Sequence, residues 1–271
     1  MNAEEHGSIL ERTRPKFRTI IEENELMGAE VSVLAQPLTP AEAIGTPGRR
    51  DFPIVLGRER VIESRVIGSR GHAFTDTPQE YVGTLENVLN LDLTASQNRA
   101  IYVATLNAVL GHLGMVNATV HCKDDDPERC ALEMARTVLD RYGRVEVGLI
   151  GLNPPIAERL VDTFGVDHVR ITDLNGDNIG TQRFGVEIWD GNDRTEELID
   201  ASDVVVLTGT SLVNGTFDRI WRRIRTRGKA YLVYGVTAAG VSELLGIDRI
   251  WPCGRGSRSL NGHTTNGRYD W

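Results

Sequence analysis

The sequence lacks long hydrophobic runs and contains only three cysteines among its 271 residues. No apolar stretch approaches the roughly 18 residues of a membrane-spanning helix. The polar start MNAEEHGSILERTRPKF has none of the hydrophobic core of a signal peptide. The cysteines Cys122, Cys130 and Cys253 are few and odd in number, which argues against a disulfide framework. We therefore expect a cytoplasmic protein in a reducing compartment.

Positive charge is also scarce, because 30 Lys and Arg residues stand against 38 Asp and Glu residues, and the formal net charge is -8 at pH 7. A surface of this charge repels phosphate backbones and anionic lipids. We therefore expect neither nucleic acid nor a membrane as a partner, and a small-molecule ligand or metal chelate instead. The sequence leaves a homo-oligomer open.

The pattern of apolar residues changes at about residue 143. The first part reads as α+β, with strand candidates at 30–38 and 61–67 and a helix within 94–114, for which Thr94 and Gln97 fit a capping box. After residue 143, short apolar runs alternate with amphipathic helices, which is typical of a mostly parallel sheet covered on both faces. We predict a small α+β domain at 1–143, an α/β ligand-binding domain at 144–253 and a flexible tail at 254–271.

The stretch VVVLTGTSLVNGTFD, residues 204–218, runs from a buried strand into small polar residues and glycine. In an open parallel sheet, ligands bind at the carboxyl ends of the strands, and four predicted strands end in such residues. The residues expected to line this edge are Gly151, Asn153, Asp173, Asn175, Thr208, Gly209, Thr210, Asn214, Tyr234 and Gly235. Taken singly, Asn153 and Asn214 also fit helix caps, so the prediction depends on all four strand ends meeting at one edge of the sheet.

The first of these loops lacks the dinucleotide fingerprint. GLIGLNPP has Gly148 and Gly151 followed by two prolines, and no phosphate-binding lysine motif occurs in the chain. NAD is therefore disfavoured. Asp173 lies about 20 residues beyond Gly151, where a nucleoside site has its ribose-binding carboxylate, so an adenosyl cofactor is left open.

Two further stretches carry reactive side chains. In VHCKDDDPERC, His121, Cys122 and Cys130 are candidate ligands of a divalent transition metal, although neighbours in a strand point to opposite faces and Asp126 also fits a helix cap. In GSRGHAFTDTP, His72 is a candidate general base with Asp76 orienting it, and the alternative is a turn at a strand end.

Asn107 is a polar residue within the apolar helix segment YVATLNAVLG. A buried amide needs hydrogen-bond partners. Asn107 is therefore counted among the candidate ligand-binding residues, and it is expected to bond either across the cleft between the two domains or only to its own loop.

Several stretches resemble a known family. VGLIGLNPPIAERL, VRITDLNGDNIG, SDVVVLTGTSLVNGTFDRI and YLVYGVT resemble the Rossmann-like domain of the heavy-metal chelation family. ESRVIGSRGHAFTD and NRAIYVATLNAVLG resemble the small domain before it, which has an enolase-N-terminal-like fold. The resemblance covers about residues 15 to 253. It implies a small α+β domain followed by a Rossmann-like parallel-sheet domain lacking the dinucleotide fingerprint, with one cleft that the loops around His72 and Asn107 would face.

For the family, the suggested roles are metal chelation, or condensation or hydrolysis in making pterin-, flavin- or siderophore-like chelators. We therefore expect a protein that binds or processes a small polar, anionic, metal-chelating molecule, with His72 and Asp76 carrying any proton transfer. Two alternatives stay open. One is a non-catalytic metal-binding protein that uses His121, Cys122 and Cys130, and the other is a transferase or hydrolase acting with an adenosyl or pterin-like ligand. Whether the protein is an enzyme is left open.

Overall fold

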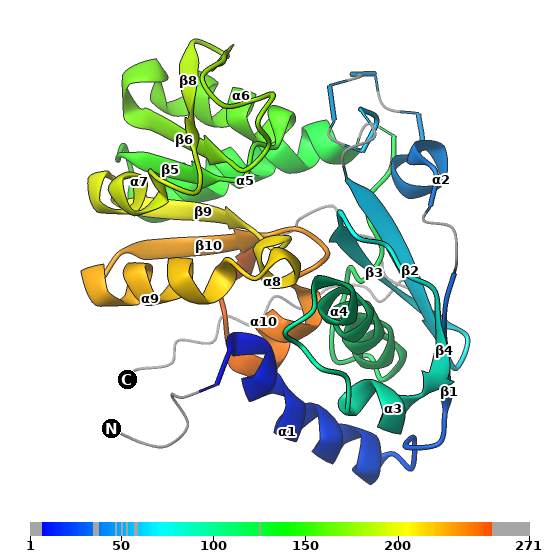
Figure 1. The fold of residues 1–271 in the computed structure, drawn as a ribbon. Helices are drawn as coiled ribbons and strands as arrows, with labels where there is room; N and C mark the ends of the chain where they lie inside the picture. Colours follow the sequence, from blue (N-terminus) through cyan, green and yellow to red (C-terminus); the bar gives the residue numbers. More distant parts are fainter. Residues whose placement is uncertain are drawn as a thin grey trace.

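The computed structural model describes residues 7–34, 38–46, 48–49, 51–52, 54–56, 59–124 and 126–250. The predicted tail at 254–271 and Cys253 lie outside the described residues. Within them the chain forms a four-stranded antiparallel sheet and a seven-stranded sheet that is mostly parallel (Figure 1). The predicted mixture of α+β and α/β architecture is thereby confirmed.

The antiparallel sheet has the strand order β3-β2-β1-β4. Its strands are β1 (Glu30–Val33), β2 (Arg60–Val66), β3 (Ser69–Thr75) and β4 (Tyr81–Thr84). Ile67 and Gly68 connect β2 to β3 as a two-residue turn, and both have positive φ angles, of 51° and 73°. The GSRGHAFTD segment is therefore a strand of this hairpin and not the loop that the resemblance implied.

The helices of the first half are α1 (Ile9–Glu23), α2 (Pro40–Ile44), α3 (Leu85–Leu89), α4 (Ser96–His112) and α5 (Asp126–Tyr142). Helix α4 is buried on all sides from Ala100 to Leu110. It packs against β2 and β3 on one side and against α8 and α10 on the other, which explains why it is apolar all round.

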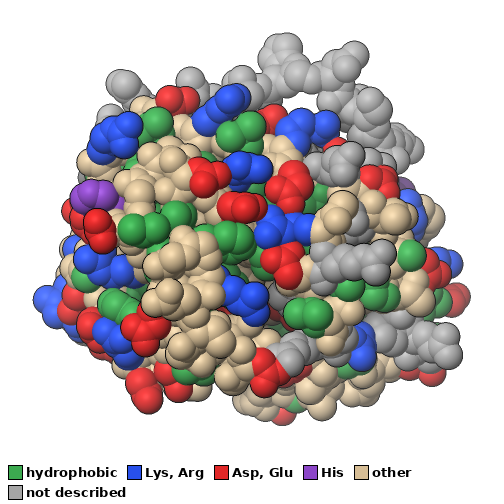
Figure 2. All heavy atoms as spheres, turned by 90° about the horizontal axis from the view of Figure 1, so that it is seen from above, with side chains coloured by type: hydrophobic (Ala, Val, Ile, Leu, Met, Phe, Trp, Pro, Cys, Tyr) green, Lys and Arg blue, Asp and Glu red, His purple; other side chains and the backbone are tan. Residues whose placement is uncertain are grey.

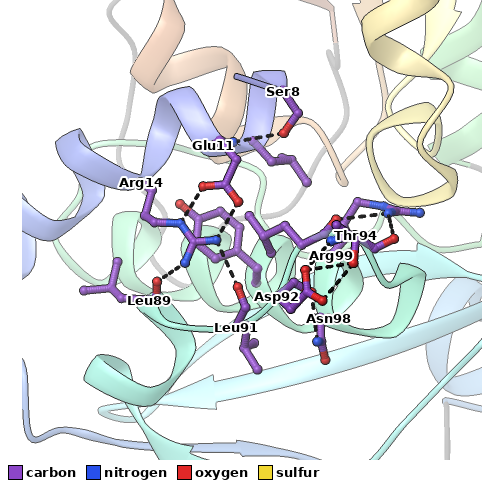
Figure 3. Close-up of polar contacts among 12 residues, drawn as sticks. Ser8, Glu11, Arg14, Leu89, Leu91, Asp92, Thr94, Asn98 and Arg99 are labelled. Atoms are coloured by element: carbon purple, nitrogen blue, oxygen red, sulfur yellow. Dashed lines mark hydrogen bonds and ion pairs between the residues drawn. The ribbon is translucent and has the colours of Figure 1, made fainter. Parts of the chain in front are cut away.

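Polar contacts attach α1 and the start of α4 to their surroundings (Figure 3). The guanidinium of Arg14 donates to the carbonyl oxygens of Leu89 and Leu91. Thr94 donates both its N–H and its hydroxyl to the carboxylate of Asp92, at 3.0 and 2.8 Å. The predicted capping box of Thr94 and Gln97 is therefore wrong, because α4 begins at Ser96 after Ala95, which makes no side-chain cap.

The larger sheet has the order β11-β10-β9-β5-β6-β8-β7. Its strands are β5 (Val147–Ile150), β6 (Val169–Asp173), β7 (Gln182–Arg183), β8 (Val186–Asp190), β9 (Val204–Thr208), β10 (Ala230–Tyr234) and β11 (Arg249–Ile250). Only β7 pairs antiparallel. The six parallel strands, taken in chain order, follow the doubly wound order 3-2-1-4-5-6, and the direction of winding reverses between β5 and β9.

Helices cover both faces of this sheet (Figure 1). They are α6 (Pro154–Phe164), α7 (Thr195–Ala201), α8 (Ser211–Asn214), α9 (Phe217–Arg227) and α10 (Ala239–Leu245). Val204 and Val206 of β9 pack in the core with α5 and α6, whereas Val205 and Leu207 pack with α7, α9 and α10. This alternation explains why β9 reads as a continuous apolar run.

The two halves of the chain share one hydrophobic core. Phe17 of α1 and Ile101 of α4 belong to the same buried cluster as Val205 of β9 and Ile224 of α9. Helix α5 precedes the predicted domain boundary at residue 143, but it packs with α6 on the parallel sheet. The boundary itself stays a prediction.

Ion pairs connect the segment after α2 to helices α5 and α6, which cover the larger sheet. The guanidinium of Arg49 lies 2.6 Å from a carboxylate oxygen of Asp51, 3.1 Å from Glu128 of α5 and 2.8 Å from Glu158 of α6. On the face shown in Figure 2, basic and acidic side chains of the described residues are interleaved without an extended area of one sign. None of the described helices is both long and apolar enough to cross a membrane.

Candidate functional site

A cavity of about 390 Å³ lies at the carboxyl ends of β5, β6, β9 and β10, where these strands face the β2–β3 hairpin. Ten predicted ligand-binding residues line it, namely Gly151, Asn153, Asp173, Asn175, Thr208, Gly209, Thr210, Asn214, Tyr234 and Gly235. Asp76, His121 and Cys130 line the same cavity, whereas His72, Cys122 and Asn107 are not among its lining residues. The structure thus gathers four strand ends around one cavity, and the binding roles of these residues stay predictions.

Gly151 forms the tight turn after β5. Its φ angle is +87°, and a Cβ atom built there would lie 2.6 Å from Cγ2 of Thr208. Its N–H donates to the carbonyl of Thr172, and its own carbonyl accepts from the hydroxyl of Tyr234 at 2.9 Å. Burial raises the pKa of the Tyr234 phenol. Glycine is therefore required here both by backbone conformation and by close packing.

Asp173 ends β6 with its carboxylate directed at the neighbouring loops. Oδ2 accepts from the N–H of Leu152 at 2.7 Å, and Oδ1 accepts from the N–H of Asn175 at 2.6 Å. Burial nevertheless raises the pKa of Asp173, because it outweighs these hydrogen bonds. The carboxylate is thus fixed in place beside the β5–α6 loop.

Two further carboxylates come from the β2–β3 hairpin. Arg60 pairs with Thr75 in the strand register, so Glu59 and Asp76 lie at the same end of the hairpin, and both line the cavity. Burial, together with the charges of Asp173 and Asp76, raises the pKa of Glu59 to about 7.

The charge inside the cavity is negative. Among the described lining residues Arg219 is the one Lys or Arg, against Glu59, Asp76 and Asp173. Arg219 donates to the carbonyl oxygens of Gly191 and Asn192, at 3.2 and 3.1 Å. The anionic ligand expected from the sequence does not suit this arrangement, because three carboxylates would repel it.

His72 pairs with Glu63 and not with Asp76. Its Nε2 lies 3.0 Å from Oε2 of Glu63, and its Nδ1 accepts from the N–H of His121 at 3.3 Å. Because β3 is a strand, Asp76 is about 13 Å along the chain from His72, at about 3.3 Å per residue. Glu63 instead stands directly opposite His72 in the β2–β3 register. The predicted orientation of His72 by Asp76 is therefore wrong.

The Glu63 carboxylate is buried with three positively charged or imidazole neighbours. Burial alone would raise its pKa, but hydrogen bonds from His72 and Arg65 and the charge of Arg70 outweigh burial and lower the pKa to about 2. Arg65 Nε lies 2.8 Å from Oε1 of Glu63. The pair of His72 and Glu63 therefore behaves as a buried structural unit beside the cavity wall.

Asn107 bonds across the boundary between the two halves. Its Nδ2 donates to the carbonyls of His72 and Val236, at 2.9 and 3.1 Å. Its Oδ1 accepts from the N–H of Gly240 at 2.7 Å. Asn107 is therefore not bonded only to its own loop, because it ties α4 and β3 to the segment after β10; a ligand-binding role in a domain cleft stays a prediction.

The three candidate metal ligands do not form one cluster. His121 lines the cavity with its ring edge-on to Phe74, and burial lowers its pKa to about 4. Cys122 is fully buried outside the lining, and Cys130 lies on the first turn of α5. In the part of the chain that the structure describes, no group of three or more His, Cys, Asp or Glu side chains could hold a metal ion. A resident soft-metal site made of these three residues therefore does not fit.

Sequence reasoning missed several residues of the cavity, including Glu59, Phe74, Thr172 and Arg219. Pairing of the RVIESRV and SRGHAFT segments as a hairpin would have been the signal for Glu59. The hydroxyl of Thr172 is buried without a hydrogen-bond partner among the described residues.

The fold and site together define an α/β protein with a cavity, lined by three carboxylates, at the switch point of a doubly wound sheet. Residues 134–248 match the model of the DUF364 family, whose description is "Putative heavy-metal chelation". The resemblance predicted from the sequence is confirmed over this segment. The sequence has no match among curated proteins.

Two solved structures are similar to this chain. A DUF364-family protein of unknown function from Pyrococcus horikoshii is 15% identical with a TM-score of 0.51, covering 85% of this chain and 80% of its own. A DUF364-family protein of unknown function from Desulfitobacterium hafniense DCB-2 is 15% identical with a TM-score of 0.44, covering 69% and 72%. At this identity the likeness to the first structure supports the fold alone.

Proposed function

We propose that the protein binds a small polar molecule that carries a metal ion, and that this ligand occupies the cavity between the β2–β3 hairpin and the parallel sheet. The observation that carries the proposal is the meeting of three carboxylates from separate segments, Glu59, Asp76 and Asp173, in one cavity with a single arginine among its described lining residues. A ligand that brings positive charge offsets the repulsion among these carboxylates.

The remaining lining suits the organic part of such a ligand. Phe52, Ile54, Phe74, Met134 and Ile156 form apolar walls. The volume of about 390 Å³ falls within the range of small-molecule sites, which is about 300 to 1,000 Å³. Because the described side chains form no metal cluster of their own, the metal ion would arrive with its chelator as one ligand.

The family description supports the same class of ligand, since it names heavy-metal chelation for residues 134–248. Chelator binding and chelator metabolism both fit the cavity. In the second case, Glu59 and Asp76 would carry proton transfer, because both line the cavity whereas His72 does not. Binding is therefore the proposal, and catalysis an extension of it.

A nucleoside or adenosyl ligand is the second candidate. The strand order 3-2-1-4-5-6 favours it, because Rossmann-like sheets bind nucleotides where the winding reverses. Asp173 lies at the end of the second parallel strand, where a ribose hydroxyl is bound in such sheets.

Isothermal calorimetry separates these candidates. The probes are Ni²⁺ alone, 2,2′-bipyridine alone, their cationic complex, the anionic complex of Ni²⁺ with nitrilotriacetate, and S-adenosylmethionine. We expect the cationic complex to bind more tightly than either component and than the anionic complex. The Asp76→Asn variant should weaken this binding, while Asp167→Asn, an exposed carboxylate outside the cavity, should leave it unchanged. Binding of S-adenosylmethionine with no response to any chelate would favour the second candidate.

A further inference from the structure

The first loop of a doubly wound sheet ordinarily receives phosphate. Backbone N–H groups after the first strand and at the N-terminus of the first helix point at the anion, and the helix dipole adds to their attraction. In this chain the corresponding segment runs from Gly151, after β5, to Ala157, in the first turns of α6.

The N–H groups of this segment are already used or absent. Gly151 donates to the carbonyl of Thr172, and Leu152 donates to the carboxylate of Asp173. Pro154 and Pro155 carry no N–H group.

The N-terminal cap of α6 uses two more of these backbone N–H groups. Asn153 caps the helix by accepting from the N–H of Ile156 on its side chain, at 3.3 Å, and from the N–H of Ala157 on its carbonyl, at 2.9 Å. Only the N–H of Asn153 itself has no bond among the described residues, and a single N–H is a weak substitute for the several that hold a phosphate.

A carboxylate also stands where the anion would bind. Asp173 Oδ2 lies 2.7 Å from the nitrogen of Leu152, so it takes the loop N–H that a phosphate oxygen would otherwise accept. Asp76 lines the same cavity and adds charge of the same sign, and Glu59 adds more once the pH exceeds its raised pKa of about 7. A phosphate group brought here would lose its donors and meet three carboxylates.

The same geometry favours a different group. Asp173 is a fixed carboxylate: it accepts the N–H of Leu152 on Oδ2 and the N–H of Asn175 on Oδ1, and the N–H of Leu174 and the side chain of Asn178 also hydrogen-bond to it. Thr172 lines the cavity with a buried hydroxyl that has no partner among the described residues, although buried hydroxyls are normally hydrogen-bonded. The charge of Asp173 and the hydroxyl of Thr172 together suit a cationic ligand that brings N–H or O–H donors.

We infer that Asp173 and the Asn153–Pro154–Pro155 cap set the ligand class of the cavity: a cationic group bearing hydrogen-bond donors binds beside Asp173, and ligands that place a phosphate there are excluded. This inference rests on the proposed function in taking the cavity as the ligand site. It adds that the ligand is not a nucleotide with phosphate beside Asp173. A nucleoside ligand would therefore have to lack phosphate in the part of the cavity next to the β5–α6 loop.

The test uses two small probes of opposite charge, hexaamminecobalt(III), a cation whose surface consists of N–H donors, and inorganic pyrophosphate. Each is titrated into the full-length, isotope-labelled protein while the backbone amide resonances of residues 151–157 and 175 are followed by NMR. We expect hexaamminecobalt(III) to shift the amides of Leu152 and Asn175 saturably, and pyrophosphate to shift neither.

Variants locate the effect. Asp173→Asn should weaken hexaamminecobalt(III) binding at least tenfold, and Asp76→Asn at least threefold, while Asp167→Asn leaves it unchanged. Asp173 accepts the backbone N–H groups of Leu152 and Asn175, so the Asp173→Asn variant can fail to fold. In that case the Asp76→Asn variant provides the test.

Three outcomes would overturn the inference: saturable pyrophosphate shifts at residues 151–157, no saturable response to hexaamminecobalt(III), or equal affinities in Asp76→Asn and Asp167→Asn. If hexaamminecobalt(III) binds as expected and every metal chelate fails to bind, the proposed function fails while this inference stands.

Discussion

The carboxylate of Asp173 accepts the N–H of Leu152 at 2.7 Å, which places a fixed negative group next to the loop after β5. This contact joins the end of β6 to the start of α6 at the reversal point of the sheet. It places a carboxylate beside the loop that carries the glycine fingerprint in dinucleotide-binding sheets, and this chain lacks that fingerprint.

Gly151→Ala should destabilise the protein by about 2 kcal/mol or more, because the side chain adds backbone strain to a clash in a packed turn. The φ angle is +87°, and the new Cβ would lie 2.6 Å from Cγ2 of Thr208. Urea denaturation measures the change. Gly176→Ala is the matched control, since no atom lies within 4 Å of its Cβ position and it should be nearly neutral. Equal stability of the two variants would contradict this account of the turn.

Asn107→Ala should cost about 3 kcal/mol, because it leaves buried backbone groups without partners. The side chain donates to the carbonyls of His72 and Val236 and accepts from Gly240. Chemical denaturation should show this loss, and Gln79→Ala, at an exposed position before β4, should change the free energy of unfolding by less than about 0.5 kcal/mol. A loss as small as that of the control would show that α4 is not held to the β10–α10 segment by this amide.

The free energy of unfolding should depend on Glu59 between about pH 4.5 and about pH 7. The folded protein raises the pKa of this carboxyl from 4.5 to about 7, so over this window the unfolded chain loses the proton first. Stability contributed by the protonated carboxyl is therefore full below pH 4.5 and is lost as the pH rises to about 7. Glu59→Gln should raise the melting temperature relative to wild type at pH 8 but not at pH 4.

A control for this comparison is Glu80→Gln, at an exposed position before β4, which should follow the wild type at both pH values. If Glu59→Gln gave the same difference from wild type at pH 4 and pH 8, the raised pKa of Glu59 would be refuted.

Glu63 should show the opposite dependence. Its pKa is lowered to about 2 because hydrogen bonds from His72 and Arg65 outweigh burial, so its contribution to stability is present above pH 4.5 and is lost as the pH falls toward 2. Glu63→Gln should destabilise the protein by about 3 kcal/mol at pH 7, because it breaks a buried pair. The difference from wild type, followed by urea denaturation, should shrink as the pH is lowered through this window. A difference that stayed constant between pH 7 and pH 3 would contradict the assignment of this pair.

The alternation of strands and helices after residue 143 could be predicted because buried parallel strands are apolar runs. Val204 to Leu207 face helices on both sides, so each residue is buried. The segment from 182 to 190, which forms β7 and β8, was not predicted, because Gln182, Arg183 and Glu187 are exposed and the strands lie at the edge of the sheet.

Strand β3 was mistaken for a loop for a specific physical reason. Gly71 was taken as a loop residue, whereas a Cβ atom there would lie 2.2 Å from the carbonyl oxygen of Ala104 and 2.3 Å from the nitrogen of Ala108. The glycine therefore allows α4 to approach the strand closely. The polar neighbour His72 is buried against Glu63, and a single sequence does not show which strand supplies such a partner.

The rim residues of the cavity were predictable because they follow from one rule about parallel strand ends, which needs only the chain order of strands. Glu59 and Arg219 were not, because their positions depend on how the hairpin and α9 dock on the sheet. The charge of the cavity was therefore missed, since it depends on those same residues.

The most direct test of the cavity as the site of a metal-carrying ligand is a crystal structure of the protein grown with the cationic nickel–bipyridine complex, in which anomalous scattering locates the nickel. We predict one anomalous peak inside the cavity, within reach of the carboxylates of Glu59, Asp76 and Asp173, and its loss in Asp76→Asn crystals. A nickel peak bound elsewhere on the molecule, with no density for the complex in the cavity, would contradict the proposed function.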